Sequence, residues 1–65
     1  MKKYIIFCYN KRNKLVYRIE IETTEKIFES QIKNGYVRFL NKETKADTMC
    51  YLNMYNKIVI EEFKI

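Results

Sequence analysis

The alternation of apolar and polar residues predicts two strands joined by a short turn in the first third of the chain. Residues 3–9 form a β-type run that is apolar on both faces. Such a strand is either central in its sheet or covered on its second face by another subunit. Residues 15–22 alternate strictly, and polar residues 10–14 separate the two runs. The pattern therefore predicts a β-hairpin with a five-residue loop.

Residues 24–33 carry the spacing of a short amphipathic helix. Thr23 and Thr24 are good N-cap residues, and Glu25 places a carboxylate in the first turn, where it complements the helix dipole. A narrow stripe of mostly apolar side chains follows, made of Ile27, Phe28, Gln31 and Ile32. Asn34 and Gly35 form a C-cap pair, with Gly35 free to adopt the left-handed conformation. Because so short a helix is unstable alone, we expect it to pack on the sheet.

The second half of the chain reads as three more strands. Residues 36–40, 48–53 and 58–65 have β character, and polar turns at 41–45 and 54–57 separate them. The order of elements is ββαβββ, with antiparallel meanders on either side of one helix. We therefore predict a single α+β domain over residues 1–65, a small antiparallel sheet with one helix packed on one face.

The composition argues against ordinary catalysis. The chain has no histidine, proline or tryptophan, and its one glycine cannot build a phosphate-binding loop. Without a histidine to activate them, Cys8 and Cys50 are read as buried small apolar residues. The carboxylates of Glu20, Glu22, Glu25 and Glu29 are read as a solvated acidic patch. We expect no enzyme activity, no metal and no cofactor.

A chain of 65 residues buries only a marginal core, so an additional stabilising factor is expected. A disulfide is disfavoured because Met1-Lys2-Lys3 runs directly into the first strand without the pattern of a signal peptide. The apolar run that follows is too short to span a membrane. We therefore expect a cytoplasmic protein with free thiols, and self-association as a homodimer is the favoured stabilising factor.

Charge and tyrosine content point to a binding surface. The formal net charge of +5 is compatible with an anionic partner, although ten of the thirteen cations are lysines in a chain of AT-rich composition. Six tyrosines are many for so small a core, and tyrosine favours interfaces. The predicted partner-binding residues lie on the first hairpin and on the tyrosine-bearing strands: Tyr9, Lys11, Arg12, Lys14, Tyr36, Arg38, Tyr51 and Tyr55.

Two alternative functions fit the same residues. The first is binding of nucleic acid, with the phosphates contacted by Lys11, Arg12, Lys14, Lys42 and Lys45. The second is sequestration of a nucleotide-like signal between subunits by tyrosine and arginine side chains. Steep dependence of binding on salt distinguishes the first alternative from a protein partner. A ligand-dependent rise in melting temperature identifies the second.

The chain resembles, in length, AT-biased composition and β-rich layout, the short proteins encoded by phages and mobile elements of AT-rich bacteria. The segment YLNMYNKIVIEE, residues 51–62, is similar to the ending common among them, in which an aromatic residue, asparagine and a turn precede Ile-x-Ile-Glu. The resemblance implies a non-enzymatic inhibitor or adaptor that binds a host protein, such as a defence or nucleic-acid-processing enzyme, in the host cytoplasm. It identifies no functional residue.

Overall fold

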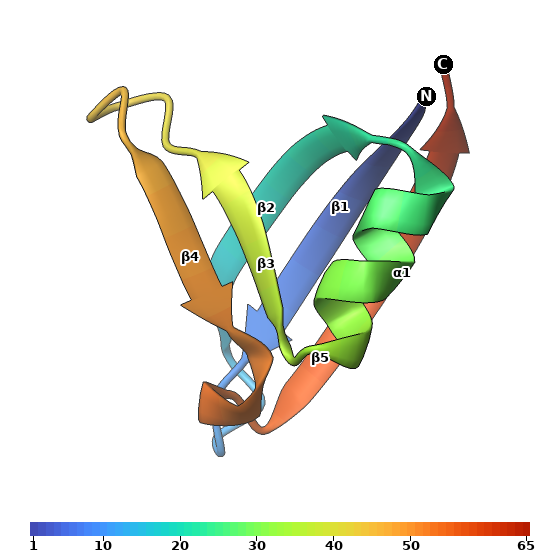
Figure 1. The fold of residues 1–65 in the computed structure, drawn as a ribbon. Coiled ribbons are helices and arrows are strands. Elements are labelled where there is room, and N and C mark those ends of the chain that lie inside the picture. The colour runs from blue at the N-terminus through green and yellow to red at the C-terminus, as the bar shows by residue number, and fades with distance from the viewer.

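A computed structural model describes the whole chain, from Met1 to Ile65, as two small antiparallel sheets and one helix (Figure 1). The predicted α+β class and the ββαβββ order are confirmed. Strands β1 (Lys2–Tyr9), β2 (Leu15–Thr23) and β5 (Lys57–Lys64) form one sheet in the order β2-β1-β5. Strands β3 (Tyr36–Leu40) and β4 (Asp47–Tyr51) form a separate hairpin that packs across it.

Strand β1 is the centre of the three-stranded sheet, which explains its two apolar faces. It pairs with β2 on one side and with β5 on the other, and Ile6 lies opposite Ile19 and Ile60. The core-facing side chains of β1, Tyr4, Ile6 and Cys8, are all buried. Of the two interpretations of this strand, the structure therefore supports the central position.

Helix α1 (Glu25–Lys33) covers the core face of the sheet, as the amphipathic stripe predicts. Its N-cap is Thr24, whose hydroxyl accepts a hydrogen bond from the Ile27 N–H. Its contact with the sheet is centred on Phe28, whose ring stacks on that of Tyr4 with 3.7 Å between ring centroids and 5° between planes. Gly35 ends the helical segment at φ +82°, in the left-handed region that favours glycine.

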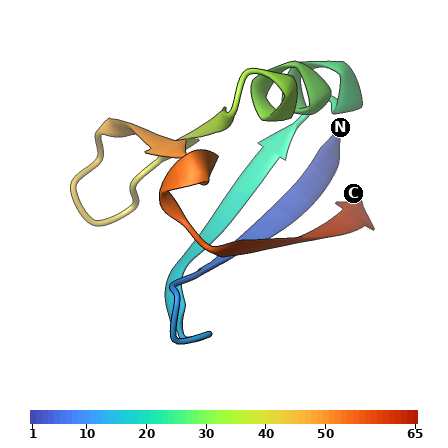
Figure 2. The same ribbon diagram turned by 90° about the horizontal axis from the view of Figure 1, so that it is seen from below.

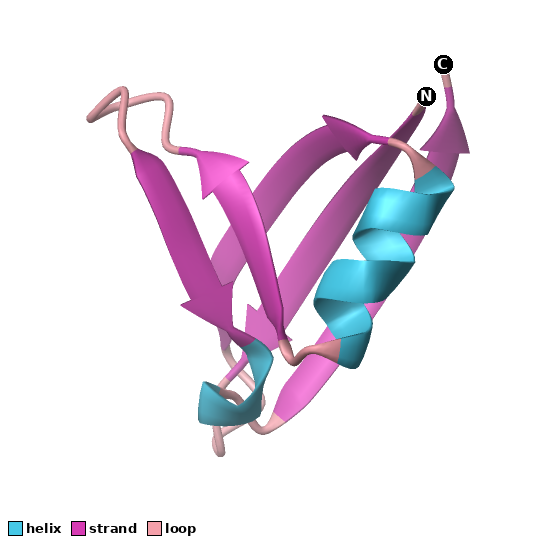
Figure 3. Ribbon diagram, in the orientation of Figure 1, coloured by secondary structure: helices cyan, strands magenta, loops and turns pink.

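The core lies between the three-stranded sheet, α1 and the β3–β4 hairpin (Figures 1 and 3). All five strands and α1 contribute apolar side chains to the core. Its fully buried members include Ile6, Cys8, Ile19 and Val37, and Phe28 and Cys50 are nearly as buried. The helices have nine and three residues, and neither has the length and apolar character needed to cross a membrane.

The fourth predicted strand ends earlier than its β-type pattern suggests. The ladder between β3 and β4 stops at the pair Tyr36–Tyr51, and residues Leu52–Met54 form a 3-10 turn, η1. The Leu52 N–H donates to the Gly35 carbonyl at 2.9 Å, which ties η1 to the end of α1. Because β3 begins only at Tyr36, β4 has no partner beyond Tyr51 and the chain turns toward β5.

Lys2 links the ends of three elements, β1, β5 and α1, at one end of the sheet. Its Nζ donates to Glu62 of β5 at 2.7 Å and to Glu25 of α1 at 3.2 Å. The hydrogen bond from Lys2 lowers the pKa of Glu62 below its ordinary value of 4.5. The same contacts, that with Glu62 first, raise the pKa of Lys2.

We expect Glu62→Gln to lower the melting temperature slightly at about pH 7 and to have no effect at about pH 2.5. A carboxyl whose pKa is lowered by folding stabilises the native state above its unfolded pKa, and this contribution is lost as the pH falls through the folded value. Thermal unfolding followed by circular dichroism at both pH values measures the difference. Glu29→Gln is the control, because Glu29 is exposed on α1 and makes no ion pair. An equal shift at both pH values would contradict the argument.

Candidate binding surface

The outer face of the β3–β4 hairpin exposes large apolar side chains. Val37 and Cys50 are opposed on the core face, so their neighbours Tyr36 and Tyr51 are opposed on the outer face. Leu40 and Met49 also lie on this face, and Met54 follows in η1. The exposed fractions are 60% for Leu40, 44% for Met49, 54% for Tyr51 and 78% for Met54. We call Tyr36, Leu40, Met49, Tyr51 and Met54 the Tyr–Met surface.

A small apolar pocket opens beside the Tyr–Met surface, at the free edge of β4. Its volume is about 180 Å³, and seven of its eight lining residues are hydrophobic. Tyr17 of β2 reaches it from the other sheet, and the Tyr17 ring meets Phe39 edge to face at 6.1 Å. Tyr55, which follows η1, also lines the pocket. The complete lining is Tyr17, Phe39, Thr48, Met49, Cys50, Tyr51, Met54 and Tyr55.

The turn between β1 and β2 presents three cations on a hydrogen-bonded backbone. Lys11, Arg12 and Lys14 are exposed, and none of them makes an ion pair. The Asn10 side-chain oxygen accepts hydrogen bonds from the backbone N–H groups of Arg12 and Lys14, at 2.9 and 3.1 Å. Asn13 completes the turn with φ 61°. The turn and η1 lie at the same end of the molecule (Figure 3).

This end of the molecule carries most of the net charge. Residues 9–17 and 48–60 contain four cations and no carboxylate, so these two segments contribute +4 of the chain's +5. They meet in space, because the Asn56 N–H donates to the Tyr9 carbonyl at 2.9 Å and Lys57 lies over the Tyr9 ring, 5.1 Å from its centroid. Exposed apolar and unpaired basic side chains therefore occur together at this end.

The structure places the predicted site residues in two groups. Tyr36, Arg38 and Tyr51 share the outer face of the hairpin, and Tyr55 lies in the adjoining pocket. Tyr9, Lys11, Arg12 and Lys14 form the end of the β1–β2 hairpin. The basic turn and η1 share one end of the molecule, whereas the β3–β4 loop with Lys42 and Lys45 lies at the other end (Figure 1). The five cations of the nucleic-acid alternative therefore do not form one patch.

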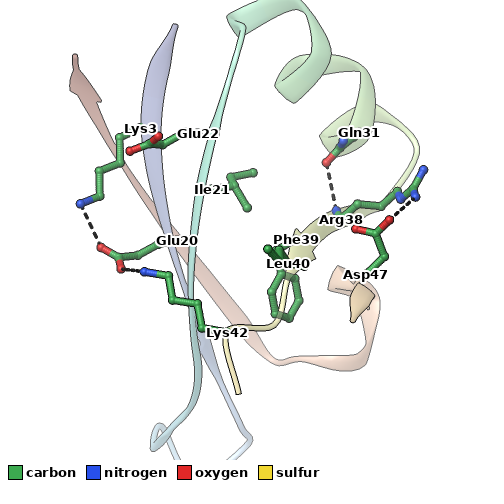
Figure 4. Close-up of a pocket in the computed structure, with 10 residues that line it drawn as sticks. All are labelled: Lys3, Glu20, Ile21, Glu22, Gln31, Arg38, Phe39, Leu40, Lys42 and Asp47. Atoms are coloured by element: carbon green, nitrogen blue, oxygen red, sulfur yellow. Dashed lines mark hydrogen bonds and ion pairs between the residues drawn. The ribbon is translucent and has the colours of Figure 1, made fainter. Parts of the chain in front are cut away.

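The largest groove of the molecule, about 590 Å³, lies between β2 and β3 and is lined mainly by charged residues (Figure 4). Most of these charges neutralise one another. Glu20 bridges Lys3 at 3.1 Å and Lys42 at 3.9 Å, and Arg38 contacts Asp47 at 3.2 Å. The pKa of Glu20 is lowered, and the hydrogen bond from Lys3 makes the largest contribution. No group of three or more histidine, cysteine or acidic side chains is arranged to hold a metal ion.

The two cysteines are free and buried in the core, as their mid-strand positions predict. Burial, with a further contribution from neighbouring Cys50, raises the pKa of Cys8 to about 11. Burial, with a further contribution from the neighbouring Cys50, raises the pKa of Tyr55 to about 12. The raised pKa of Cys8 favours its neutral thiol, which is a poor nucleophile.

We expect both thiols to react with iodoacetamide on the order of 10²-fold more slowly in the native protein than in guanidinium chloride. The reason is that Cys8 is fully buried and Cys50 is 6% exposed. Mass spectrometry of quenched samples at about pH 8 would count the alkylated sites. Native labelling at the denatured rate would show that the interior opens readily and would contradict the expectation.

Sequence reasoning missed Leu40, Met49 and Met54 as surface residues. A strand pattern alone identifies the alternate faces of residues 36–40 and 48–53, but it does not show which face is covered. Tyr17 of β2, which was not among the predicted site residues, is 38% exposed at the pocket. One signal in the sequence was available. Residues 36–40 and 48–53 have apolar side chains at both odd and even positions, and therefore on both faces of each strand.

Comparisons of the chain with protein-family models, curated proteins and solved structures gave no match.

Proposed function

We propose that this protein acts by binding another protein, without catalysis, as an inhibitor or adaptor. The observation that supports the proposal is the Tyr–Met surface, whose members Met49, Tyr51 and Met54 also line an apolar pocket. Tyrosine gives a large contact area at low entropic cost, and methionine adapts its shape to a partner. A side chain of the partner would occupy the pocket.

The basic turn adds a preference for an acidic partner. Lys11, Arg12 and Lys14 have no internal carboxylate to neutralise them, and the hydrogen bonds of Asn10 hold their backbone in one conformation. Preorganised charges steer association and set orientation more than they add affinity. A partner with an acidic rim around one projecting apolar side chain would complement both features. By the compositional resemblance, we infer a host enzyme in the cytoplasm, bound by a phage-type protein.

Nucleic-acid binding is the second candidate, and the +4 charge of residues 9–17 and 48–60 favours it. Two observations weigh against it. Lys42 is engaged with Glu20, and the loop holding Lys45 lies at the opposite end of the molecule from the basic turn. The remaining cations form a small contact for a phosphate backbone, whose binding depends on several charges along one track.

Affinity capture from host lysate with and without nuclease distinguishes the two candidates. The wild-type protein is compared with Tyr51→Ala, which alters the Tyr–Met surface, and with Lys26→Ala, which alters an exposed residue of α1. We expect a protein captured by the wild type and by Lys26→Ala, with or without nuclease, and lost with Tyr51→Ala. Capture that nuclease abolishes would support the nucleic-acid candidate. Capture unaffected by Tyr51→Ala would refute the proposed surface.

A further inference from the structure

Strand β5 is an open edge of the three-stranded sheet. The strand order β2-β1-β5 leaves one side of β5 without a partner, and no other element lies beyond it (Figure 2). It pairs with β1 from Lys57 to Lys64 without a register shift, and it contains neither proline nor glycine. Edge strands commonly carry a bulge, a proline or an inward-pointing charge that prevents pairing with another chain. The segment from Lys57 to Glu61 has none of these.

The sequence of this segment is complementary to itself in the antiparallel direction. Residues 57–61 read Lys-Ile-Val-Ile-Glu, so a positive and a negative residue are placed symmetrically about Val59, with isoleucines between. A two-fold axis perpendicular to a sheet places one residue opposite itself and keeps the two faces continuous. With Val59 on the axis, Lys57 of each copy lies opposite Glu61 of the other, and Ile58 lies opposite Ile60.

We propose that the protein forms a homodimer through antiparallel pairing of β5 with β5 of a second copy, with Val59 on the two-fold axis. The dimer has a continuous six-stranded sheet in the order β2-β1-β5-β5-β1-β2. It is independent of the proposed binding function, which uses the Tyr–Met surface and the turn between β1 and β2.

The faces of the sheet match across this axis. On the core side, Ile6 lies opposite Ile60 and Cys8 opposite Ile58 within one copy, so the new junction extends an apolar row. On the other side, Phe7 lies opposite Val59, and the axis brings Val59 of both copies together. Ile60, which is 41% exposed in the single chain, gains a cross-strand neighbour.

Neighbouring registers lack this complementarity. An axis at Glu61 or at Lys57 opposes two like charges, which is destabilising. An axis at Ile60 puts Lys57 opposite Phe63 and Ile58 opposite Glu62, and an axis at Ile58 leaves Lys57 opposite Val59. The symmetric pattern of residues 57–61 also favours a second copy of this chain as the partner of β5. Pairing with an unrelated strand would not require the pattern to be symmetric. Glu62, an inward-pointing charge held by Lys2, lies outside the paired segment.

A charge-reversal cycle measured by sedimentation velocity tests both the dimer and its register. We expect the wild type to shift from its 8.0 kDa monomer toward a dimer as concentration rises from about 5 to about 500 µM, as for a small interface. Lys57→Glu and Glu61→Lys each create two opposed like-charge pairs and should weaken the dimer dissociation constant about tenfold or more. The double variant Lys57→Glu with Glu61→Lys restores opposite charges and should return the constant to within about threefold of the wild type.

The controls match the change in net charge at another surface. Lys26→Glu and Glu29→Lys reverse exposed, unpaired residues of α1, and they should leave the dimer unchanged. Circular dichroism melting of each variant verifies that it folds. A monomer at every concentration would overturn the proposal and leave β5 open to a foreign strand. A dimer that the single reversals do not weaken, or that the double reversal does not restore, would also overturn it.

Discussion

Phe28→Ala is expected to remove roughly 3–5 kcal/mol of folding stability. The Phe28 ring is 6% exposed and stacks on buried Tyr4, so its removal leaves a cavity between α1 and the sheet. A chain of 65 residues has a total stability of roughly 3–10 kcal/mol, by the usual stability per residue. The loss is therefore comparable to the whole, and α1 has no other fully buried side chain to hold it.

Thermal unfolding followed by circular dichroism measures this effect. We expect Phe28→Ala to lower the melting temperature by more than about 15 °C or to abolish the cooperative transition. Ile27→Ala is the matched control, because Ile27 is adjacent on the same helix and 50% exposed. If the two variants shifted the melting temperature equally, the helix would not be anchored through Phe28.

Tyr51→Ala is expected to weaken binding to the captured partner protein by about 30-fold or more, the scale of an interfacial hot spot. Tyr51 is 54% exposed, borders the apolar pocket and lies opposite Tyr36. Its removal takes away contact area at the centre of the Tyr–Met surface. Because the side chain is exposed, the melting temperature of the variant should change little.

Surface plasmon resonance separates the contribution of Tyr51 from that of the basic turn. Tyr51→Ala should raise the dissociation rate, whereas Arg12→Glu should mainly slow association and reduce its dependence on salt. Lys45→Glu makes the same charge change on the distant β3–β4 loop and serves as the control. An effect of Lys45→Glu equal to that of Arg12→Glu would show that net charge, and not the basic turn, governs association.

Many residues of the candidate surface could be predicted from the sequence, but which of them lie together could not. Tyr36, Arg38, Tyr51 and Tyr55 were predicted from residue type, and the structure brings them to one hairpin and its pocket. Arg38 was predicted to bind a partner, and its side chain contacts Asp47 at 3.2 Å. Opposed positions across strands depend on register, which a single strand's pattern does not specify.

The sequence by itself determined the order and type of the elements. Strict alternation in residues 15–22, the Thr24 cap and the Asn34–Gly35 end act within a few residues, so their effect does not depend on the rest of the chain. The burial of Cys8 follows from the same local pattern, whereas the central position of its strand was one of two interpretations that the pattern allowed.

Only the tertiary structure decided that the strands divide into two sheets, that β5 is an edge and that the outer face of β3–β4 is uncovered. It also decided that β4 stops at Tyr51, because the partner strand starts at Tyr36. These features depend on which segments pair across the chain. The two faces of the β3–β4 hairpin both carry apolar side chains, but the small core can cover only one of them. Packing around Ile6, Phe28 and Val37 selects the face that is buried.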